Sequence, residues 1–355
     1  MAIDKVTTAA ITDGTITSSD LASGTIANQS AFKNIIINGD MSINQRNTSV
    51  SGLGNGAAGY RVQDRWKLKE QGSESFIFTM SKDTDVPSGY GFASSLKLDC
   101  TTADSSIASD GSLRIQQFVE GQNLQYLKKG TSSADSLTCS FWIKSTKTGT
   151  FILELYDSDN TRQISQSYTV SSSDTWEKKT LTFAGDTTGA FTNDANASLE
   201  LNFWLAAGSD YSSGTLNTSW NSVTAANRAV GQVNISDSTS NNWLITGVQL
   251  EAGTSASDFE FLPHDINLQR CYRYYFKTKS SQWLYAINST NNNSRSEVVF
   301  KNTMRATPTA TVAFSASGTG TGTQNANINH VTVYVNGIGS GDTSLNTGAE
   351  FDAEL

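Results

Sequence analysis

The stretch NIIINGDMSINQR, residues 34–46, separates two parts of the chain that differ in amino-acid composition and pattern. Its three consecutive isoleucines are β-branched and predict a strand over Asn34–Ile43, and the Asn-Gly-Asp that follows them offers turn chemistry. Before it lies a low-complexity leader. After it, up to about Pro263, short apolar runs alternate with turn residues, and WLITGVQLE at 243–251 is a second strong apolar run. We expect these two runs to open and close one β-sandwich.

The composition predicts an all-β protein. Long windows rich in Ala, Leu, Glu and Lys are scarce, so long helices are not expected. Runs of alternating apolar and polar residues recur between Ser, Thr, Asn, Asp and Gly, as in a sandwich or jelly roll. Beyond the opening run, strands are predicted at Val62–Lys69, Phe76–Met80, Ser95–Cys100, Leu113–Glu120, Ser136–Lys144, Thr150–Asp157, Gln163–Val170, Glu177–Phe183, Ser198–Ala206 and Trp243–Glu251.

The leader has a period of five residues, written VTTAA ITDGT ITSSD LASGT IANQS from residue 6. One large apolar residue in five cannot build a core of its own, so the stripe must be buried against identical copies or another protein. A disordered Ser/Thr/Gly tail is the alternative. The residues of this predicted attachment and oligomer stripe are Val6, Ile11, Ile16, Leu21 and Ile26.

Charge and hydropathy exclude several classes of function. The net charge of −8 and the pI of about 4.9 disfavour binding to phosphate backbones, so no nucleic-acid partner is expected. No run of 18 apolar residues occurs, so no membrane insertion is expected. The first residues do not have the pattern of a signal peptide. We expect the chain to be made and folded in a cytoplasm.

The residues that carry enzyme chemistry are sparse. The two histidines, His264 and His330, have no neighbouring Cys or His and no zinc motif, and no nucleophile elbow, phosphate loop or dinucleotide fingerprint occurs. The loop GTGTG at 318–322 lacks a strand-then-helix setting and is expected to be flexible. The three cysteines, Cys100, Cys139 and Cys271, suit buried thiols better than a disulfide or a metal site. We expect no catalytic residues, no cofactor and no metal.

Successive side chains of a strand point to opposite faces, so each predicted strand can be divided into two rows. The second rows mix aromatic and hydrogen-bonding groups, which suits a sugar. The alternative to a sugar-binding face is that these aromatics lie under loops, such as Gly208–Gln232, or in a subunit interface. The core rows are Leu113, Ile115, Gln117, Val119; Leu137, Cys139, Phe141, Ile143; Phe151, Leu153, Leu155; and Leu199, Leu201, Phe203, Leu205. The second rows are Arg114, Gln116, Phe118; Ser140, Trp142, Lys144; Glu154, Tyr156; and Asn202, Trp204.

After Pro263 the sequence pattern changes twice, first to helical spacing and then to short apolar runs between long polar loops. HDINLQRCYRYYF at 264–276 has apolar residues at helical spacing, and Asp265 can cap its start, so a short linking helix is predicted. The remainder is a small β unit with long Gly-, Ser- and Asn-rich loops, which suit an exposed tip. Its predicted strands are Gln282–Asn288, Glu297–Lys301, Thr309–Ser315, Asn329–Val335 and Ala349–Asp352, and its predicted loops are 289–297, 317–329 and 336–348.

Several of these motifs together resemble bacteriophage tail-fibre and related virion proteins that carry a jelly-roll domain. NIIINGDMSINQR followed by RVQDRW resembles the opening of that domain, SLRIQQFVEG and SLTCSFWIKS its middle strands, and WLITGVQLEAGTSASDFEFLPHDINLQRCYRYY its closing segment. FKNTMRATPTATV and FDAEL are similar to the C-terminal unit that often follows. The resemblance implies a homotrimeric fibre with an N-terminal attachment segment (1–33), a jelly roll (34–262), a linker helix (263–276) and a C-terminal tip (277–355).

That jelly roll is similar to carbohydrate-binding modules, in which a concave sheet face binds glycan through aromatics. The resemblance therefore implies a virion protein that attaches through residues 1–33 to other tail or head proteins and binds a host-surface glycan without catalysis. A purely structural head-fibre or tail-connector subunit is the alternative, and a polysaccharide depolymerase is a second one. The expected glycan-binding residues are Trp142, Tyr156 and Trp204 on the sheet face, with Tyr211 and Trp220 from the long loop.

Overall fold

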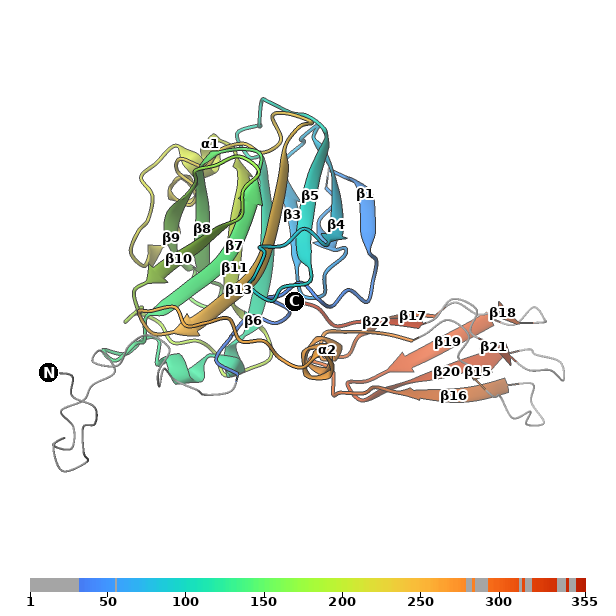
Figure 1. Cartoon of the computed structure of the whole chain (residues 1–355). Helices are drawn as coiled ribbons and strands as arrows, with labels where there is room; N and C mark the ends of the chain where they lie inside the picture. Colours follow the sequence, from blue (N-terminus) through green and yellow to red (C-terminus); the bar gives the residue numbers. More distant parts are fainter. Residues whose placement is uncertain are drawn as a thin grey trace, which may run out of the picture.

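The fold is a β-sandwich followed by a helix and a smaller group of strands (Figure 1). The structure is a computed structural model, and it describes residues 32–54, 56–278, 283–284, 293–312, 315–316, 321–336, 343–344 and 349–355. The predicted stripe of the leader, Val6, Ile11, Ile16, Leu21 and Ile26, lies outside the described residues.

Two antiparallel sheets form the sandwich. Sheet A has the order β1 (Ser49–Leu53), β4 (Ile77–Asp83), β5 (Ser95–Thr102), β13 (Asn242–Ala252), β7 (Leu137–Ser145) and β10 (Glu177–Phe183). Sheet B has the order β12 (Asn221–Ser222), β9 (Arg162–Val170), β8 (Gly149–Asp157), β11 (Ala197–Ala207), β6 (Ser112–Glu120), β3 (Lys67–Gln71) and β2 (Gly59–Tyr60). The predicted all-β class is confirmed, and from Phe76 onward the predicted sandwich strands are found with ends shifted by a few residues.

The core lies between the two sheets and follows from the alternation of the strands. All four predicted core rows are buried, including the polar Gln117, and the apolar members belong to one hydrophobic cluster. Aromatic rings join the sheets at its centre, where Phe203 of β11 packs edge-on against Phe141 of β7 at 5.1 Å. Burial of these side chains is the main stabilising contribution to the sandwich, at about 1.5–3 kcal/mol for each large residue. The three cysteines are free and buried.

The opening stretch is not a strand, so the prediction for Asn34–Ile43 is wrong. Its backbone turns at Asn38, which takes the left-handed φ of 58° that Asn tolerates well. The side chain of Asn38 donates to the carbonyl oxygens of Ile43 and Asp64 and accepts from the Ile43 N–H, each at 2.9 Å. Side-chain hydrogen bonds thus replace the ladder that a strand would have made.

This irregular segment nevertheless lies beside the closing strand β13. The Ile35 N–H donates to the Leu250 carbonyl, and the Val248 N–H donates to the Gly39 carbonyl, both at 2.9 Å. A Cβ atom on Gly39 would stand 2.0 Å from the Val248 carbonyl oxygen, so only glycine permits this close approach. The two runs that were expected to bound the sandwich are therefore hydrogen-bonded to each other.

Helix α2 (His264–Tyr272) connects the sandwich to the C-terminal strands, as predicted for this segment. All three predicted loops contain strand residues, because β16 covers part of 289–297, β19 part of 317–329 and β21 part of 336–348. Most of the predicted strand Gln282–Asn288 lies outside the described residues. The C-terminal sheets are β14 (Tyr275–Lys277), β22 (Ala349–Asp352) and β17 (Thr309–Val312); β15 (Trp283–Leu284), β21 (Thr343–Ser344) and β18 (Ser315–Ala316); and β16 (Asn293–Val299), β20 (His330–Asn336) and β19 (Thr321–Ala326).

A network of buried ion pairs joins the end of the chain to the sandwich, where Figure 1 marks the C-terminus. The guanidinium of Arg65 pairs with Glu354 and also donates to the Phe118 carbonyl at 2.6 Å. Its plane lies over the ring of Tyr274, with Cζ 3.5 Å from the ring centroid. The Arg65 side chain is fully buried and that of Glu354 is 4% exposed, so neither charge has water as an alternative partner.

A second buried ion pair fixes the helix end to sheet B. Glu120, at the end of β6, accepts two hydrogen bonds from Arg273 at 2.7 and 2.6 Å, and one from the Tyr274 hydroxyl. Burial raises the pKa of Glu120, but the hydrogen bonds from Arg273, Tyr274 and Gln122 outweigh burial and hold the net pKa below its ordinary value of 4.5. The ionised form of Glu120 is therefore the one that stabilises the junction.

The substitution Asn38→Ala tests the role of the opening stretch. It leaves buried backbone groups of the segment without partners and replaces a residue suited to the left-handed conformation. We expect the free energy of unfolding in urea to fall by about 3 kcal/mol. Asn47→Ala, at the exposed position directly after the stretch, is the control and should change stability little. Equal stabilities of the two variants would contradict the assigned role.

The substitution Glu120→Gln tests the second ion pair. Because the folded pKa of Glu120 is depressed, its contribution is present above the unfolded pKa and is lost as the pH falls through the folded pKa. Urea unfolding of the native chain should therefore show a steeper loss of stability between about pH 5 and pH 3 than unfolding of Glu120→Gln. The exposed Asp110→Asn serves as the control, and parallel pH profiles for all three proteins would refute the prediction.

Candidate functional site

The outer face of sheet B carries the mixed aromatic and polar rows that were predicted for β6, β8 and β11. The strand register brings these rows together, since Asn202 lies opposite both Gln116 and Glu154, and Glu200 lies opposite both Phe118 and Tyr156. Lys67 and Lys69 extend the face across β3, where Lys67 lies opposite Gln116 and Lys69 opposite Arg114. We call this surface the sheet B face. Its residues are Lys67, Lys69, Arg114, Gln116, Phe118, Glu154, Tyr156, Glu200, Asn202 and Trp204.

Trp142 is not part of this face, so the prediction that it shares a surface with Tyr156 and Trp204 is wrong. It lies on β7, which pairs with β10 and β13 in sheet A, and its outer side is the opposite surface of the sandwich. There its ring packs against that of Tyr90 at a centroid distance of 4.2 Å. Alternation within a strand gave the correct face of β7 but not the sheet to which β7 belongs.

Trp204 lies on the expected face but is fully buried. The segment Gly208–Gln232, which includes α1 (Ser209–Ser212), covers it and places the Tyr211 ring 5.3 Å from the Trp204 ring. With Ile152 and Ala229 these two aromatics form a small separate core. The alternative that aromatics of the second rows lie under a loop is thus correct for Trp204. Neither Trp204 nor Tyr211 offers an open ring to a ligand.

Trp220 lies away from the sheet B face. It precedes the edge strand β12, its Nε1–H donates to the Ala184 carbonyl at 2.7 Å, and its ring packs against the main core. Its contacts identify it as a residue that closes the edge of the sandwich. Of the five predicted aromatics, Tyr156 alone combines a place on the sheet B face with a ring that is partly exposed.

Most polar groups at the floor of the sheet B face are satisfied by one another. Arg228 reaches down from the covering loop and donates to both oxygens of Glu154, at 2.7 and 2.9 Å. The same carboxylate accepts from the Trp204 indole and from the Asn202 amide, both at 3.1 Å. Gln116 in turn donates to Asn202. This network fixes the side chains of the floor in one arrangement.

Arg114 is the exception in this network. Its side chain is buried, with 5% of the residue exposed, yet within the described chain it makes no hydrogen bond and no ion pair. Its guanidinium lies over the ring of Trp204, with Cζ 4.6 Å from the centroid. Burial, together with the nearby charge of Arg228, lowers the pKa of Arg114 to about 10. A buried cation without a carboxylate partner retains unused hydrogen-bond donors.

Above this floor, four side chains form a partly exposed rim: Lys67, Phe118, Tyr156 and Glu200. The Nζ atom of Lys67 lies 4.8 Å from the centre of the Phe118 ring. Burial and the neighbouring Glu154 raise the pKa of Glu200. The rim therefore offers two rings on which an apolar surface can stack and two charged groups that can bind hydroxyls.

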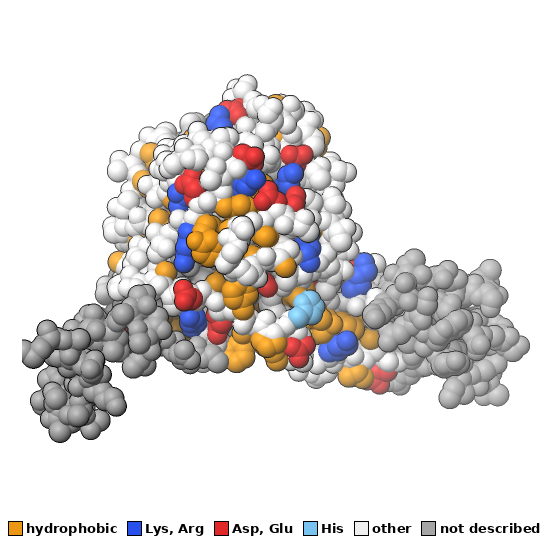
Figure 2. All heavy atoms as spheres, viewed as in Figure 1, with side chains coloured by type: hydrophobic (Ala, Val, Ile, Leu, Met, Phe, Trp, Pro, Cys, Tyr) orange, Lys and Arg blue, Asp and Glu red, His pale blue; other side chains and the backbone are white. Residues whose placement is uncertain are grey.

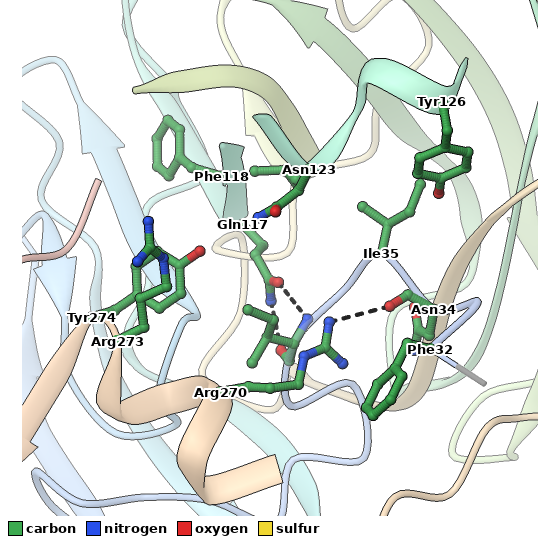
Figure 3. Close-up of a pocket in the computed structure, with 12 residues that line it drawn as sticks. Phe32, Asn34, Ile35, Gln117, Phe118, Asn123, Tyr126, Arg270, Arg273 and Tyr274 are labelled. Atoms are coloured by element: carbon green, nitrogen blue, oxygen red, sulfur yellow. Dashed lines mark hydrogen bonds between the residues drawn. The ribbon is translucent and has the colours of Figure 1, made fainter. Parts of the chain in front are cut away.

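A pocket of about 350 Å³ adjoins the sheet B face at the end of β6 (Figure 3). Phe118 lines both, so the two surfaces meet at this ring. Its walls come from the opening stretch, β6, the 3-10 turns Gly121–Asn123 and Gln125–Leu127, and helix α2. No sequence pattern indicated this pocket, because its lining residues come from three separate segments, 32–37, 117–126 and 270–274.

The described chain holds no cluster of three or more His, Cys, Asp and Glu side chains that could bind a metal ion. Asp157, the last residue of β8, accepts hydrogen bonds from the backbone of Asp159 and Asn160 and pairs with Lys129 at 2.5 Å. Its carboxylate is therefore already occupied. Across the described helices, none has the length and apolarity needed to cross a membrane.

Comparison with known proteins gives no family for the chain. No model of a known protein family matches it, and no curated protein matches it. Among solved structures it is similar to the enzymatically active domain of bacteriophage CBA120 tailspike protein 4, with 17% identity and a TM-score of 0.33 over 62% of this chain and 21% of that one. This chain thus spans about a fifth of that tailspike chain.

Two carbohydrate-binding modules show comparable likeness. The family 11 module of a Clostridium thermocellum cellulosomal cellulase is 12% identical, with a TM-score of 0.28 over 58% of this chain and 97% of the module. A family 30 module is 12% identical, with a TM-score of 0.29 over 65% of this chain and 91% of the module. Likeness at this level carries no argument about ligands, which must come from the residues of this chain.

The substitution Trp204→Ala tests the assigned structural role of this residue. Removing a fully buried tryptophan leaves a cavity under the covering loop and removes a donor to Glu154. We expect a loss of about 3–5 kcal/mol in the free energy of unfolding. Tyr156→Ala, on the same face but partly exposed, should cost about 1 kcal/mol or less. Thermal and urea unfolding measure both, and a Trp204→Ala protein of native stability would overturn the assignment.

Proposed function

We propose that the protein is a subunit of a phage virion fibre that binds a glycan of the host surface through the sheet B face, without catalysis. The observation that carries this proposal is Arg114, a buried guanidinium with unused donors at a floor whose other polar groups, Gln116, Glu154 and Asn202, are paired. The resemblance of the sequence motifs to virion fibre proteins supports the setting. Attachment to the particle through residues 1–33 and a homotrimeric state belong to the same proposal.

The chemistry of the rim suits a sugar. One side of a sugar ring is covered by C–H groups that pack on aromatic rings, and its edge carries hydroxyls that need hydrogen-bond partners. Tyr156 and Phe118 provide rings, while Arg114, Lys67 and Glu200 provide donors and an acceptor. A single site of this kind binds weakly, and several copies in one fibre would raise the overall affinity through avidity.

The arrangement of the carboxylates favours binding over hydrolysis. Glycoside hydrolysis requires two carboxyl groups that can act on one bond, one as the acid and the other as base or nucleophile. Both oxygens of Glu154 accept hydrogen bonds from Arg228, and Asn202 and Trp204 also donate to it. Glu154 is therefore committed to the network and is poorly placed to exchange protons with a substrate.

A purely structural role in the virion is the second candidate, and an aromatic patch on the opposite surface favours it. Tyr90 and Phe261 are 55% and 50% exposed, and the Phe92 ring lies 5.1 Å from both Phe259 and Phe261. With Trp142 these residues form what we call the sheet A patch. Figure 2 shows hydrophobic side chains gathered on this side of the sandwich below a group of charged ones. Exposed patches of this kind often mark protein interfaces.

A glycan microarray of bacterial surface polysaccharides, probed with the full-length protein, tests the proposed function. Tyr156→Ala should weaken binding at least about tenfold, because loss of ring stacking costs on the order of 1 kcal/mol or more at each copy. Arg114→Met, which keeps the length of the buried side chain, should do the same. Trp142→Ala removes a partly exposed aromatic from the other sheet and is the matched control.

The outcomes separate the candidate functions. Binding that persists in Tyr156→Ala but is lost in Trp142→Ala would place the site on the sheet A patch. Failure of the native protein to bind any glycan or to adsorb to host cells would refute the proposal in favour of a structural role. Light scattering on each variant shows whether a loss of binding is only a loss of assembly, and shortening of a bound polysaccharide would indicate a depolymerase.

A further inference from the structure

The pocket at the end of β6 contains an arginine whose charge is not neutralised. Arg270, in the last turn of α2, extends its guanidinium into the pocket toward Asn34 (Figure 3). Its one hydrogen bond is donated by an Nη2–H to the Asn34 carbonyl at 3.3 Å. Within the described chain no carboxylate lies at ion-pair distance from it. Arg273, three residues later, instead has both hydrogen bonds to Glu120.

Some of the neighbouring polar groups already have hydrogen-bond partners in the described chain, and others do not. Gln117 is occupied, because it accepts from the Ile37 N–H at 2.8 Å and donates to the Ile37 carbonyl at 2.9 Å. The side-chain amide of Asn123 and the hydroxyl of Tyr126, by contrast, have no hydrogen-bond partner among the described residues. The pocket thus presents several free N–H donors, one free amide and one free hydroxyl.

The pocket also presents apolar surfaces of the kind on which a ring can stack. Phe32 is 58% exposed and Tyr126 is 50% exposed, and both lie at its mouth. The volume of about 350 Å³ falls at the lower end of the range for small-molecule sites. An occupant that matches these features is compact, has a carboxylate for the arginine, has hydroxyls for the amide and phenol, and has one apolar face.

We propose that this pocket binds an acidic sugar residue, with its carboxylate on Arg270, its hydroxyls on Asn123 and Tyr126, and its C–H face against an aromatic ring. The inference rests on the proposed glycan-binding function and names the class of glycan, a uronic or sialic acid-containing polymer. Arginine binds a carboxylate through two parallel hydrogen bonds, which a neutral sugar cannot offer. Because Phe118 lines both the pocket and the sheet B face, one chain of sugars can reach both.

The electrostatics of the site agree with this occupant. Burial in the pocket wall lowers the pKa of Arg270, which means that the surroundings disfavour its charge. A bound carboxylate would supply the missing counter-charge and restore the pKa. Glu260, whose charge acts on Arg270 from outside the pocket lining, accepts hydrogen bonds from the backbone N–H groups of Phe32 and Asn34 and is therefore engaged elsewhere.

Titration calorimetry with two matched pairs of ligands tests the proposal. Methyl glucuronide and methyl galacturonide are compared with methyl glucoside and methyl galactoside, which replace the carboxylate by a neutral group. The full-length native protein should bind at least one uronide at least tenfold more tightly than its neutral partner. Arg270→Gln should abolish this preference, and Tyr126→Ala, at an exposed ring, should weaken binding of both members of the pair.

Lys128→Gln is the control, because Lys128 is 56% exposed, follows the same 3-10 turn and pairs with Asp135 away from the pocket. It removes the same unit of charge and should leave the preference for the uronide intact. Thermal unfolding shows that each variant is folded. Equal affinities for acidic and neutral sugars, or an unchanged preference in Arg270→Gln, would overturn the proposal. Hippurate, a carboxylate on an apolar body, would overturn it by binding where no uronide does.

These outcomes are distinct from failure of the proposed function. If the native protein binds polysaccharides on the array but shows no preference for uronides, glycan binding stands and the pocket assignment fails. If a uronide binds through Arg270 while no polysaccharide is bound, the pocket is a small-molecule site and the proposed function fails.

Discussion

The buried ion pair between Arg65 and Glu354 is the interaction on which the placement of the C-terminal strands against the sandwich depends. It joins a residue of the turn between β2 and β3 to Glu354, 289 residues later in the sequence. Both side chains are almost completely buried, so removing one partner would leave an uncompensated charge, at a cost of about 3–5 kcal/mol. Arg46 adds a parallel contact, since it pairs with Asp352 at 3.0 Å and lies over the ring of Tyr275. The C-terminal strands are therefore fastened to the sandwich by charge as well as by packing.

This constraint gives the opening stretch its importance. Asn38 binds the backbone of the stretch itself, accepts from the Trp66 indole and donates its N–H to Asn267 of α2. The stretch lies between β13, β6 and the helix, so three segments that are far apart in sequence meet there. Its conformation is set by these contacts and not by the strand propensity of its isoleucines, which is why the pattern predicted a strand that does not form.

How much could be predicted from the sequence differs between core and site. The alternating rows identified the buried residues correctly, because burial of one strand face is a local property. Assignment of strands to sheets is not local, and so Trp142 was placed beside Tyr156 although the two lie on opposite sides of the sandwich. Burial of Trp204 depends on the fold of a long loop that contains only short regular elements. The pocket around Arg270 was not foreseen, since no periodicity connects its three segments.

Arg114 and Arg270 are both desolvated guanidinium groups that make no ion pair with a carboxylate of the described chain. The chain has 33 acidic and 25 basic residues, so carboxylates are in excess and arginines can readily find partners. Arg65, Arg228 and Arg273 each do so. Leaving a desolvated guanidinium without a carboxylate costs stability, and it is expected where a ligand supplies the missing partner. Arg114 and Arg270 lie on surfaces that meet at Phe118. This proximity argues that the two arginines serve one extended ligand whose negative charge complements theirs.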